Sequence, residues 1–351
     1  MRAARFHAAH DIRIENVPAP AVRPGTVAID VAWCGICGTD VHEYLEGPIF
    51  VPAANSPHPL THEAPPVTLG HEFSGVVAEL GEGVEGLSVG ESVVVEPYVV
   101  CDDCLPCKAG NYHLCTRIGV IGLAGHGGGL SERVVVESRW VHPVGDIPLD
   151  QAALIEPLAV AYHAVQRSGA TPESTALVAG AGPVGLLLAA VLKGIGVTTI
   201  VSEISAARLA QAADIADHVL NPTDDAVADR VRELTGGSGV DIGFECAGVN
   251  DVLDTVLDAV RPAGVVVNVS IWGSRASVDM QKIVLKEIDL RGTFAYVNSH
   301  KDVISLVQEG RIDLAPFITS QIGLSDVVSK GLTTLIEDNE SSIKILVSPT
   351  M

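Results

Sequence analysis

Aromatic side chains make up only 4% of the 351 residues, so small and β-branched side chains must build most of the core. Basic residues are also scarce: 22 Lys and Arg stand against 43 Asp and Glu, a formal net charge of −21. Such an acidic chain repels phosphate backbones and anionic lipids, which argues against nucleic acid and membranes as partners. The length predicts one large or two medium globular domains.

The sequence also lacks an export signal. Its first residues, MRAARFHAAHDIRIENV, contain no apolar core of about 7–15 residues, the mark of a signal peptide. Seven cysteines, an odd number, fit a reducing cytoplasm better than a disulfide framework. One uncharged run, Thr175–Leu192, is long enough to suggest a membrane span, but its three glycines and one proline favour a strand, a turn and a buried helix. We therefore expect a cytoplasmic protein without a membrane span.

The pattern of predicted elements changes along the chain. Valine-rich runs at 27–33, 73–80 and 92–96 predict strands in a first, mostly β region. Helical spacing follows at 149–169. Strands are then predicted at 175–180, 198–203, 218–222, 240–248, 265–272 and 289–296, alternating with helices at 182–196, 205–216, 225–236 and 250–264. This alternation is typical of an α/β fold with a parallel, doubly wound sheet.

The last fifty residues lose the alternation, with a helix near 300–310 and a terminal strand at 342–349. We expect this tail to return to the first domain. The predicted organisation is a catalytic domain from residues 1–153, a nucleotide-binding domain from 154–295, and a return to the catalytic domain from 296–351.

A glycine pattern, GAGPVG, lies between a predicted buried strand and a predicted helix. In that context Gly180-x-Gly182-x-x-Gly185 indicates a dinucleotide-binding turn. Gly180 makes the turn, Gly182 lets the backbone approach a pyrophosphate, and Gly185 permits close packing of helix on sheet. The N–H groups at the start of the helix favour phosphate.

Glu203 comes eighteen residues after Gly185, at the end of the next predicted strand. A carboxylate there can accept both adenosine ribose hydroxyls and repels a 2′-phosphate, so NAD is predicted over NADP. Arg208 qualifies this prediction, because it could lie over the adenine or contact a phosphate. Further cofactor contacts are expected from Pro183, Val184, Cys246, Val269 and Ser270.

Four cysteines lie within fifteen residues, in CDDCLPCKAGNYHLC at 101–115. A disulfide knot, an iron–sulfur cluster and a zinc site are the three possibilities. A reducing compartment argues against the first. The first three spacings match a ferredoxin run, but the fourth cysteine comes after seven residues, lacks the trailing proline and has no second cluster motif beside it. Zinc is favoured, in a closed site of four thiolates that holds a lobe together.

Three further residues, Cys37, His71 and Glu156, are a soft, a borderline and a hard ligand spread over 120 residues. Such a set, with one position left open, suits a catalytic zinc. Each residue alone would be unremarkable, since a single histidine is more often an ordinary core or surface residue and Glu156 could be a first-turn helix acid.

These motifs occur in the order found in a known family. GHEFSG, the Cys-x2-Cys-x2-Cys-x7-Cys loop and the late GAGPVG resemble the zinc-containing medium-chain alcohol dehydrogenases over essentially the full length. The resemblance implies a GroES-like, mostly β catalytic domain and a Rossmann cofactor domain, with NAD and two zinc ions. It implies Cys37, His71 and Glu156 around the catalytic zinc, and Glu72 as a neighbour or exchangeable ligand. The structural zinc would be held by Cys101, Cys104, Cys107 and Cys115.

The family also implies a mechanism. An alcohol bound at the open position of the zinc has a lowered pKa, and hydride then leaves to the nicotinamide. Thr39 and His42 fit the family's proton relay: the Thr39 hydroxyl bonds the substrate oxygen and His42 passes the proton outward through the cofactor ribose. Imidazole, with an unperturbed pKa of about 6.5, suits that task. Cys34 is expected to pack near the site.

With a glutamate in place of a cysteine as the third zinc ligand, the sequence resembles the polyol and diol branch of this family. CGICGTDVHEYLEGPIFVP, PVTLGHEFSG and ALIEPLAVAYHAV resemble the (R,R)-2,3-butanediol dehydrogenases within it. The substrate implied is a small vicinal diol or its ketol, with (R,R)-2,3-butanediol and acetoin as the expected pair. A sorbitol-type or other secondary-alcohol dehydrogenase remains the alternative. The stretch 46–66 could cap the pocket, although solvated side chains are the favoured interpretation of His58 and His62.

Two other classes stay open: a cofactor-binding relative without catalysis, and a zinc-free reductase. The presence of the three ligands and both relay residues argues against them. The resemblance implies homodimers or homotetramers, formed through edge strands near 265–272 and 289–296.

Overall fold

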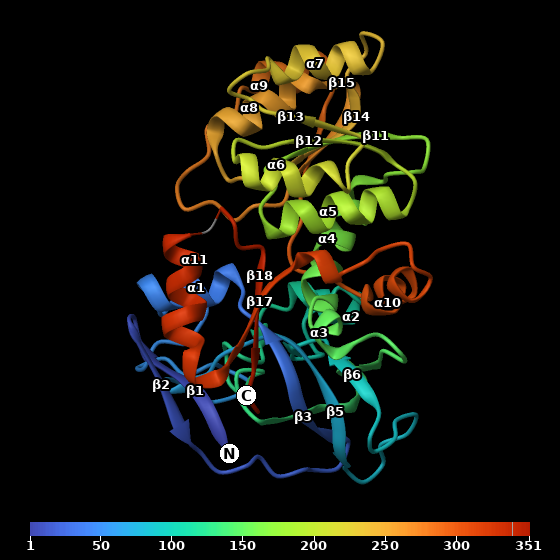
Figure 1. The fold of residues 1–351 in the computed structure, drawn as a ribbon. Helices are drawn as coiled ribbons and strands as arrows, with labels where there is room; N and C mark the ends of the chain where they lie inside the picture. The colour runs from blue at the N-terminus through green and yellow to red at the C-terminus, as the bar shows by residue number, and fades with distance from the viewer. Residues whose placement is uncertain (339) are drawn as a thin grey trace. The chain divides into compact units, whose positions relative to one another are not determined.

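The structure is a computed structural model that describes residues 1–338 and 340–351. The chain divides into two units. Unit 1 comprises residues 1–156, 300–308 and 313–351, and unit 2 comprises 157–299 and 309–312. Figure 1 follows the chain through both, from the blue N-terminus to the red C-terminus. Among the described residues we find no helix with both the length and the apolar composition that crossing a membrane requires.

Unit 1 is mostly β, and its largest sheet is built around β3 (Thr26–Gly35), a largely buried strand rich in small and β-branched residues. β3 pairs antiparallel with three other strands of the sheet, and the sheet continues outward on both sides. The remaining members are β5 (Glu72–Leu80), β6 (Ser92–Val95), β9 (Arg133–Glu137), β10 (Val141–Pro143), β17 (Ile318–Gly323) and β18 (Lys344–Ser348). Two of these, β17 and β18, come from the end of the chain, so the tail completes the sheet of the first unit.

Smaller elements surround this sheet. One three-stranded sheet and one two-stranded sheet hold β1 (Arg2–Ala8), β2 (Asp11–Asn16), β4 (Val67–Thr68), β7 (Tyr98–Val99) and β8 (Gly119–Val120). The helices of unit 1 are α1 (Gly38–Glu46), α2 (Leu105–Lys108), α3 (Leu149–Ala152), α10 (His300–Gln308) and α11 (Thr333–Glu337), the last preceded by a π-helix, Val327–Leu332. α4 (Ile155–Ser168) begins in unit 1 and continues in unit 2.

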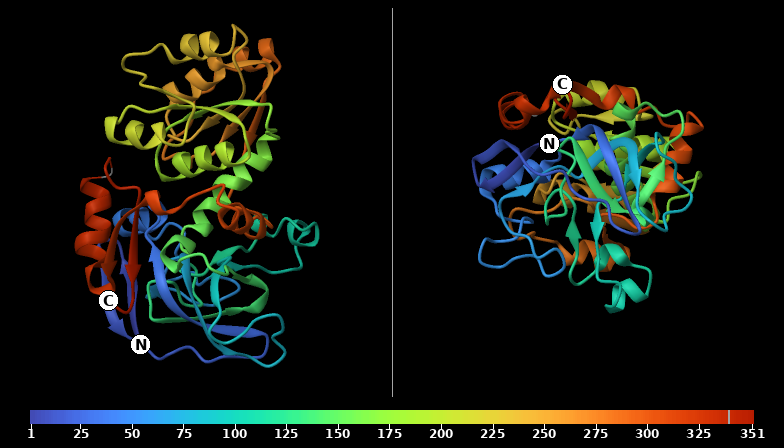
Figure 2. Two further views of the ribbon diagram at one scale, coloured as in Figure 1. Left: turned by 45° about the vertical axis from the view of Figure 1, so that its right-hand side comes forward. Right: turned by 90° about the horizontal axis from the view of Figure 1, so that it is seen from below.

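Unit 2 holds one parallel sheet of six strands in the order β13-β12-β11-β14-β15-β16. Figures 1 and 2 show helices on both faces of this sheet. The order reverses between β11 and β14, the point where a doubly wound sheet binds its ligand. The strands are β11 (Thr175–Ala179), β12 (Thr198–Ser202), β13 (His218–Leu220), β14 (Val240–Glu245), β15 (Val260–Asn268) and β16 (Asp289–Gly292). The helices are α5 (Pro183–Gly194), α6 (Ala206–Ala213), α7 (Val227–Leu234), α8 (Asn250–Ala259) and α9 (Met280–Lys286).

The mostly β unit and the doubly wound unit confirm the predicted fold class. One boundary was wrong: the helix predicted at 250–264 ends at Ala259, and the next strand starts at Val260 rather than 265. Pro262 has no N–H for a helix, and Ala263 takes a left-handed φ of 55°. The sequence pattern also missed α1, which lies in the region where short β segments were expected, and gave no prediction for the segment that forms α9.

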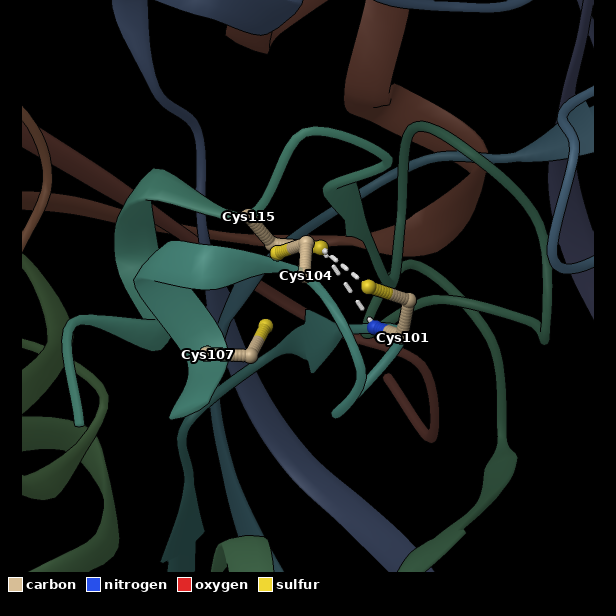
Figure 3. Close-up of side chains that lie close together, drawn as sticks. All are labelled: Cys101, Cys104, Cys107 and Cys115. Carbon is tan, nitrogen blue, oxygen red and sulfur yellow. Dashed lines mark hydrogen bonds between the residues drawn. The ribbon is translucent and has the colours of Figure 1, made fainter. Parts of the chain in front are cut away.

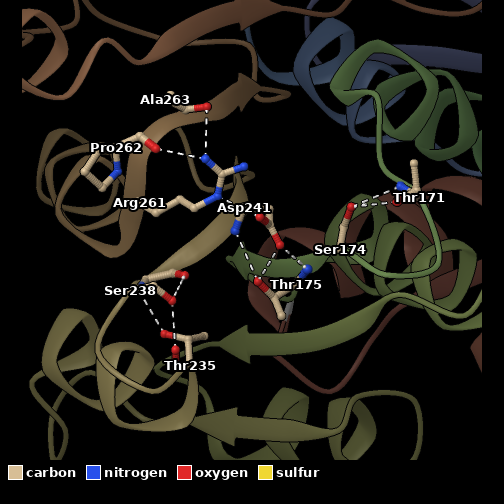
Figure 4. A network of polar contacts seen from close by, with 10 residues as sticks. Thr171, Ser174, Thr175, Thr235, Ser238, Asp241, Arg261, Pro262 and Ala263 are labelled. Atoms are coloured by element: carbon tan, nitrogen blue, oxygen red, sulfur yellow. Dashed lines mark hydrogen bonds and ion pairs between the residues drawn. The ribbon is translucent and has the colours of Figure 1, made fainter.

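The core of unit 2 is aliphatic, as the scarcity of aromatics predicts. Leu177, Ile200, Val256 and Val266 are among its fully or nearly fully buried residues. A polar network closes the end of this sheet opposite the glycine turn (Figure 4). The Asp241 carboxylate accepts hydrogen bonds from the backbone N–H and the hydroxyl of Thr175 at 2.8 and 2.9 Å, and from Nε of Arg261 at 2.7 Å.

This network ties the first residues of three neighbouring strands, β11, β14 and β15, to one charge. Burial raises the pKa of the Asp241 carboxyl, but the hydrogen bonds from Arg261 and Thr175 outweigh it and hold that pKa below its usual value. The ionised carboxylate is therefore the form that stabilises the folded state.

We predict that Asp241→Asn lowers the free energy of unfolding by about 1–3 kcal/mol at pH 7, since hydrogen bonds to charged groups contribute that much. Because the folded pKa is depressed, this stabilisation is present above the unfolded pKa of about 3.9 and is lost as the pH falls through the folded value. Urea unfolding at pH 7 and pH 3.5 measures both effects.

The control is Asp229→Asn, because Asp229 pairs with Arg232 on an exposed helix face. Surface pairs of this kind contribute about 0–1 kcal/mol. Equal losses in the two variants at pH 7 would contradict the role given to Asp241.

Candidate functional site

Strand register brings the expected metal ligands of unit 1 together. Gly35, the last residue of β3, pairs with Glu72, the first residue of β5, so Cys37 just beyond one strand meets His71 just before the other. Ligand atoms of Cys37, His71 and Glu72 lie within 4.8 Å of one another. Gly35 permits this arrangement, because a Cβ there would overlap the Glu72 carboxylate.

Asp40 fixes the start of this site. Cys37 is the N-cap of α1, and its backbone N–H donates to Oδ2 of Asp40 at 2.9 Å, as in a capping box. The other carboxylate oxygen, Oδ1, lies 3.8 Å from Nδ1 of His71. Asp40 is fully buried, so one carboxylate holds the Cys37 backbone and places a negative charge beside the His71 ring.

The electrostatics of this cluster suit a cation. Burial lowers the pKa of His71, but the negative charges of Asp40, Cys37 and Glu156 outweigh it and raise that pKa well above its usual value. The same anions would stabilise a divalent metal ion at this point. A thiol, an imidazole and carboxylates are the donors that zinc prefers, so the residues fit the metal that the sequence predicts.

Glu72 is neutralised by a lysine from the other end of the chain. Nζ of Lys344, the first residue of β18, lies 2.8 and 2.7 Å from the two carboxylate oxygens of Glu72 and 3.3 Å from the Ile36 carbonyl oxygen. Both side chains are buried. Burial lowers the pKa of Lys344, yet the Glu72 charge, assisted by Cys37 and Glu156, keeps it raised.

Glu156 lies outside the tight cluster, although it was the predicted third ligand. It is buried at the second position of α4, and its charge acts on both His71 and Lys344. Glu72, predicted as neighbour or exchangeable ligand, is the carboxylate inside the cluster. Cys34 is fully buried beside it, and burial raises the pKa of its thiol, so this side chain is unreactive packing.

The two residues predicted for the proton relay lie on α1. Oγ1 of Thr39 is 3.6 Å from Sγ of Cys37. His42 follows three residues later, so the two side chains occupy adjacent turns on one side of the helix. Thr39 is half-buried and His42 is exposed. The helix therefore leads from the half-buried Cys37 to solvent in two steps.

The four cysteines of the 101–115 loop form a second cluster (Figure 3). Their four Sγ atoms lie within 4.8 Å of one another, and Sγ of Cys101 and Sγ of Cys115 are 3.4 Å apart. Cys104 caps the short helix α2, and backbone N–H groups of Cys107 and Thr116 lower the pKa of its thiol to about 6. All seven cysteines of the chain are free thiols. The loop therefore gathers four sulfur ligands in one compact set, as expected for a structural zinc.

The glycine turn of unit 2 has the geometry that the pattern predicts. Gly180 takes a φ of 103°, which disfavours other residues. Gly182 is the N-cap of α5 and has open space where a Cβ would lie, so its backbone is accessible. At Gly185 a Cβ would overlap the Gly180 carbonyl oxygen. Pro183 and Val184 form the first turn of the helix, whose N–H groups suit a pyrophosphate.

Glu203 lies against this turn. Its carboxylate accepts hydrogen bonds from the backbone N–H groups of Ala181 at 2.7 Å and of Ile204 and Ser205 at 2.9 Å. Nη1 of Arg208 is 3.9 Å away. Each carboxylate oxygen can accept more than one hydrogen bond, so capacity remains for a ribose hydroxyl.

The other expected cofactor contacts gather at the carboxyl ends of β14 and β15. Cys246 lies beside the turn, with its backbone carbon near Gly180, and burial raises the pKa of its thiol. Val269 and Ser270 donate backbone hydrogen bonds to the Glu245 carbonyl oxygen. Glu245 itself is fully buried, and its carboxylate accepts the N–H groups of Ala247 and Gly248 at 2.8 and 2.7 Å.

The interpretation of the histidines in the 46–66 stretch was half right. His62 is exposed, but His58 is half-buried and its ring is 3.1 Å from the Ile118 carbonyl oxygen. Thr61 donates to the Ala124 carbonyl oxygen at 2.6 Å, and Glu63 accepts the His126 N–H at 2.9 Å. Three contacts from residues 58–63 thus fix this stretch to the segment 118–126.

Three charged residues with clear roles were missed by sequence reasoning: Asp40, Lys344 and Glu245. Asp40 carries a local signal, because an acid three residues after an N-cap is a capping-box pattern. Lys344 and Glu245 are single charges inside apolar strand patterns, SIKILV and DIGFEC, where a buried charge needs a partner. The sequence pattern shows that each buried charge requires a partner, but only the fold shows which residue is that partner.

We predict that Lys344→Met lowers the free energy of unfolding by about 3–5 kcal/mol, because it leaves the buried Glu72 carboxylate without its counter-charge. Lys330→Met is the matched control: Lys330 pairs with Asp326 on the surface, where such pairs contribute about 0–1 kcal/mol. Guanidinium unfolding at pH 7 compares the two. A loss below 1 kcal/mol in Lys344→Met would contradict the account of this pair.

Comparison with known proteins adds to this geometry. Residues 23–146 match the model of the alcohol dehydrogenase GroES-like domain, and 183–309 match that of the zinc-binding dehydrogenases. An (R,R)-butanediol dehydrogenase of Neisseria gonorrhoeae is 55% identical, with all of both chains covered. Another, from Bacillus subtilis, is 44% identical over 99% of this chain and all of the relative.

A solved structure is also similar to this chain over its whole length. The crystal structure of 2R,3R-butanediol dehydrogenase from Bacillus subtilis superposes with a TM-score of 0.93 at 43% identity and covers 99% of each chain. Together with the cysteine–histidine–carboxylate cluster and the glycine turn, these matches leave one assignment. The chain belongs to the zinc-binding, medium-chain alcohol dehydrogenase family.

Proposed function

We propose that this enzyme reversibly oxidises (R,R)-2,3-butanediol to acetoin, with NAD as hydride acceptor and zinc as Lewis acid. One observation carries the proposal: a thiol, an imidazole and a carboxylate, from Cys37, His71 and Glu72, lie close together, and the Thr39 hydroxyl lies beside Cys37. The same place therefore offers ligands for a metal ion and the first group of a path for the proton. The likeness to two proteins named (R,R)-butanediol dehydrogenase selects the substrate within the family.

For the catalytic zinc we propose Cys37, His71 and Glu156 as ligands. Glu72 is the carboxylate nearer to Cys37 and His71, but Lys344 already engages both of its oxygens. Glu156 supplies a second carboxylate whose charge acts on His71. Glu72 then serves as an exchangeable ligand, available whenever its bond to Lys344 loosens.

We propose a second, structural zinc on the four cysteines of the 101–115 loop. The tetrathiolate set has no position left for substrate. Its role is to hold the lobe, since binding energy at such a site is folding energy.

When bound, the zinc would polarise the alcohol oxygen and the nicotinamide would accept the hydride from its carbon. The chain supplies the proton path. Thr39 holds the substrate hydroxyl by a hydrogen bond, and His42, on the next turn and exposed, takes the proton to solvent. Asp40 keeps Cys37 and His71 oriented, as partners of metal ligands do.

We further propose NAD rather than NADP, on the position of Glu203 against the glycine turn. Its negative charge would repel a 2′-phosphate. A cytoplasmic location follows from the need to keep seven thiols reduced.

A second copy of the chain is the partner we propose, as homodimer or homotetramer. Six large apolar side chains are exposed between residues 271 and 294 of unit 2, on β16, on α9 and beside them, and Leu285 is 82% exposed. β16 is also an edge strand with unpaired backbone groups. The residues are Ile271, Met280, Val284, Leu285, Leu290 and Phe294.

A substrate panel with NAD tests the proposed function. We expect (R,R)-2,3-butanediol to give the highest kcat/KM, ahead of the (S,S) isomer and of sorbitol. NADH absorbance measures each rate, and acetoin with NADH measures the reverse direction. A preference for sorbitol would favour the polyol alternative, and no turnover of any alcohol by zinc-loaded protein would favour a non-catalytic relative.

We predict that Glu203→Ala weakens NAD binding and relaxes discrimination against NADP, because it removes the negative charge at the adenosine end. The ratio of kcat/KM for the two cofactors measures the change. Glu233→Ala, which removes an exposed acid of α7, is the control and should leave the ratio unchanged. Equal use of NAD and NADP by the unaltered enzyme would show that Glu203 does not select the cofactor.

We predict that His42→Ala lowers alcohol oxidation by up to about 10²–10⁴-fold near neutral pH, the usual contribution of a general base. Zinc content and NAD affinity should persist, since His42 is neither a ligand nor part of the glycine turn. The loss should shrink at high pH, where hydroxide substitutes for the imidazole. Wild-type rates from pH 6 to 9, with chemistry rate-limiting, would remove His42 from the mechanism.

A further inference from the structure

A third group of potential metal ligands lies in unit 1, away from both clusters already described. Glu96 follows β6, His142 is the middle residue of β10, and His300 is the first residue of α10. One ligand atom from each lies within 4.8 Å of the others. The proposed function uses none of the three.

One carboxylate oxygen of Glu96 lies close to both histidine rings. Oε1 of Glu96 is 2.8 Å from Nε2 of His142 and 3.9 Å from Nδ1 of His300. The two imidazole rings are 4.9 Å apart between centres, with 29° between their planes. Two imidazoles that share one zinc, each through a nitrogen about 2.0–2.1 Å from it, place their ring centres roughly 5 Å apart. The ring spacing therefore fits a shared ion.

The three side chains are shielded from water. Their exposed side-chain fractions are 4% for Glu96, 15% for His142 and 0% for His300. Burial lowers the pKa of His300 to about 3, so its ring is neutral and has a lone pair to offer. Burial raises the pKa of Glu96, but the hydrogen bonds from His142 and Tyr112 outweigh it, so that pKa is lowered and the carboxyl is ionised.

An outer partner holds the Glu96 carboxylate in place. The Tyr112 hydroxyl donates to Oε2 of Glu96 at 2.8 Å, which leaves Oε1 toward the histidines. Metal-binding histidines and carboxylates characteristically have such second partners, which fix their orientation.

We propose that Glu96, His142 and His300 bind a divalent transition-metal ion, with zinc as the ion that this donor set suits. Two nitrogens and one carboxylate oxygen are borderline ligands, which favour zinc over magnesium or calcium. Complete burial of His300 leaves no access for a substrate, so the site is structural.

Such an ion would crosslink three distant parts of the chain. Glu96 follows β6, His142 lies on β10, and His300 is the residue at which the chain re-enters unit 1, while Tyr112 of the cysteine lobe is joined to Glu96 by its hydrogen bond. The metal would thus anchor the cysteine lobe and the return of the chain to one point. Its loss would lower stability without touching Cys37, His71 or the relay.

Metal content and anomalous scattering test the proposal. Wild-type protein, purified with zinc and dialysed against metal-free buffer, should hold one zinc per chain more than His142→Asn and more than Glu96→Gln. The Glu96→Gln variant keeps the size and hydrogen-bonding capacity of the side chain, so it separates loss of a ligand from loss of a hydrogen bond. Crystals of the wild type should show an anomalous peak at the zinc edge between Oε1 of Glu96 and Nε2 of His142.

His7→Asn is the matched control, since Nε2 of His7 is 2.9 Å from Oε1 of Glu15 in a pair without a third donor. Its metal content should equal that of the wild type. No anomalous peak at the cluster, or equal zinc in wild type and both cluster variants, overturns the proposal and leaves a hydrogen-bonded network. The anomalous measurement on wild-type crystals tests the proposal even if a variant fails to fold.

Discussion

The pairing register of β3 is the constraint on which the active-site geometry depends. β3 pairs with β5 so that Gly35 faces Glu72, and with β18 so that Gly35 faces Leu346. One strand end therefore collects Cys37, His71 and Lys344 from parts of the chain that are up to 307 residues apart. A slip of one residue would turn every side chain to the opposite face and disperse the cluster.

Charge is concentrated where this register brings acids together. Asp40, Glu72 and Glu156 lie in or beside one buried region, and Lys344 offsets only part of their charge. Burying unbalanced carboxylates is costly unless a cation accompanies them. The cluster is therefore poised for a divalent ion, and the same balance explains why a lysine stands inside an otherwise apolar final strand.

Much of this could be predicted from sequence, because the signals were local. The alternation of strands and helices, the glycine turn and the four-cysteine loop each lie within short segments whose spacing has a physical meaning. Lys344 and the Glu96 group could not be predicted, since their partners are set by strand pairing over long distances. The helix predicted at 250–264 was too long because the chain passes directly from α8 into β15 at Val260. The first helix-breaking residue, Pro262, comes only after that junction.

The central proposal is that Cys37 would hold a catalytic metal and Cys104 a structural one. The direct measurement compares NADH formation, zinc content and thermal unfolding in Cys37→Ser and Cys104→Ser. The account predicts that Cys37→Ser melts close to the wild type, has one zinc fewer and shows no turnover of butanediol. Cys104→Ser should instead lose stability, because metal binding at that loop is folding energy. A folded Cys37→Ser variant that still oxidises butanediol at the wild-type rate would contradict the account.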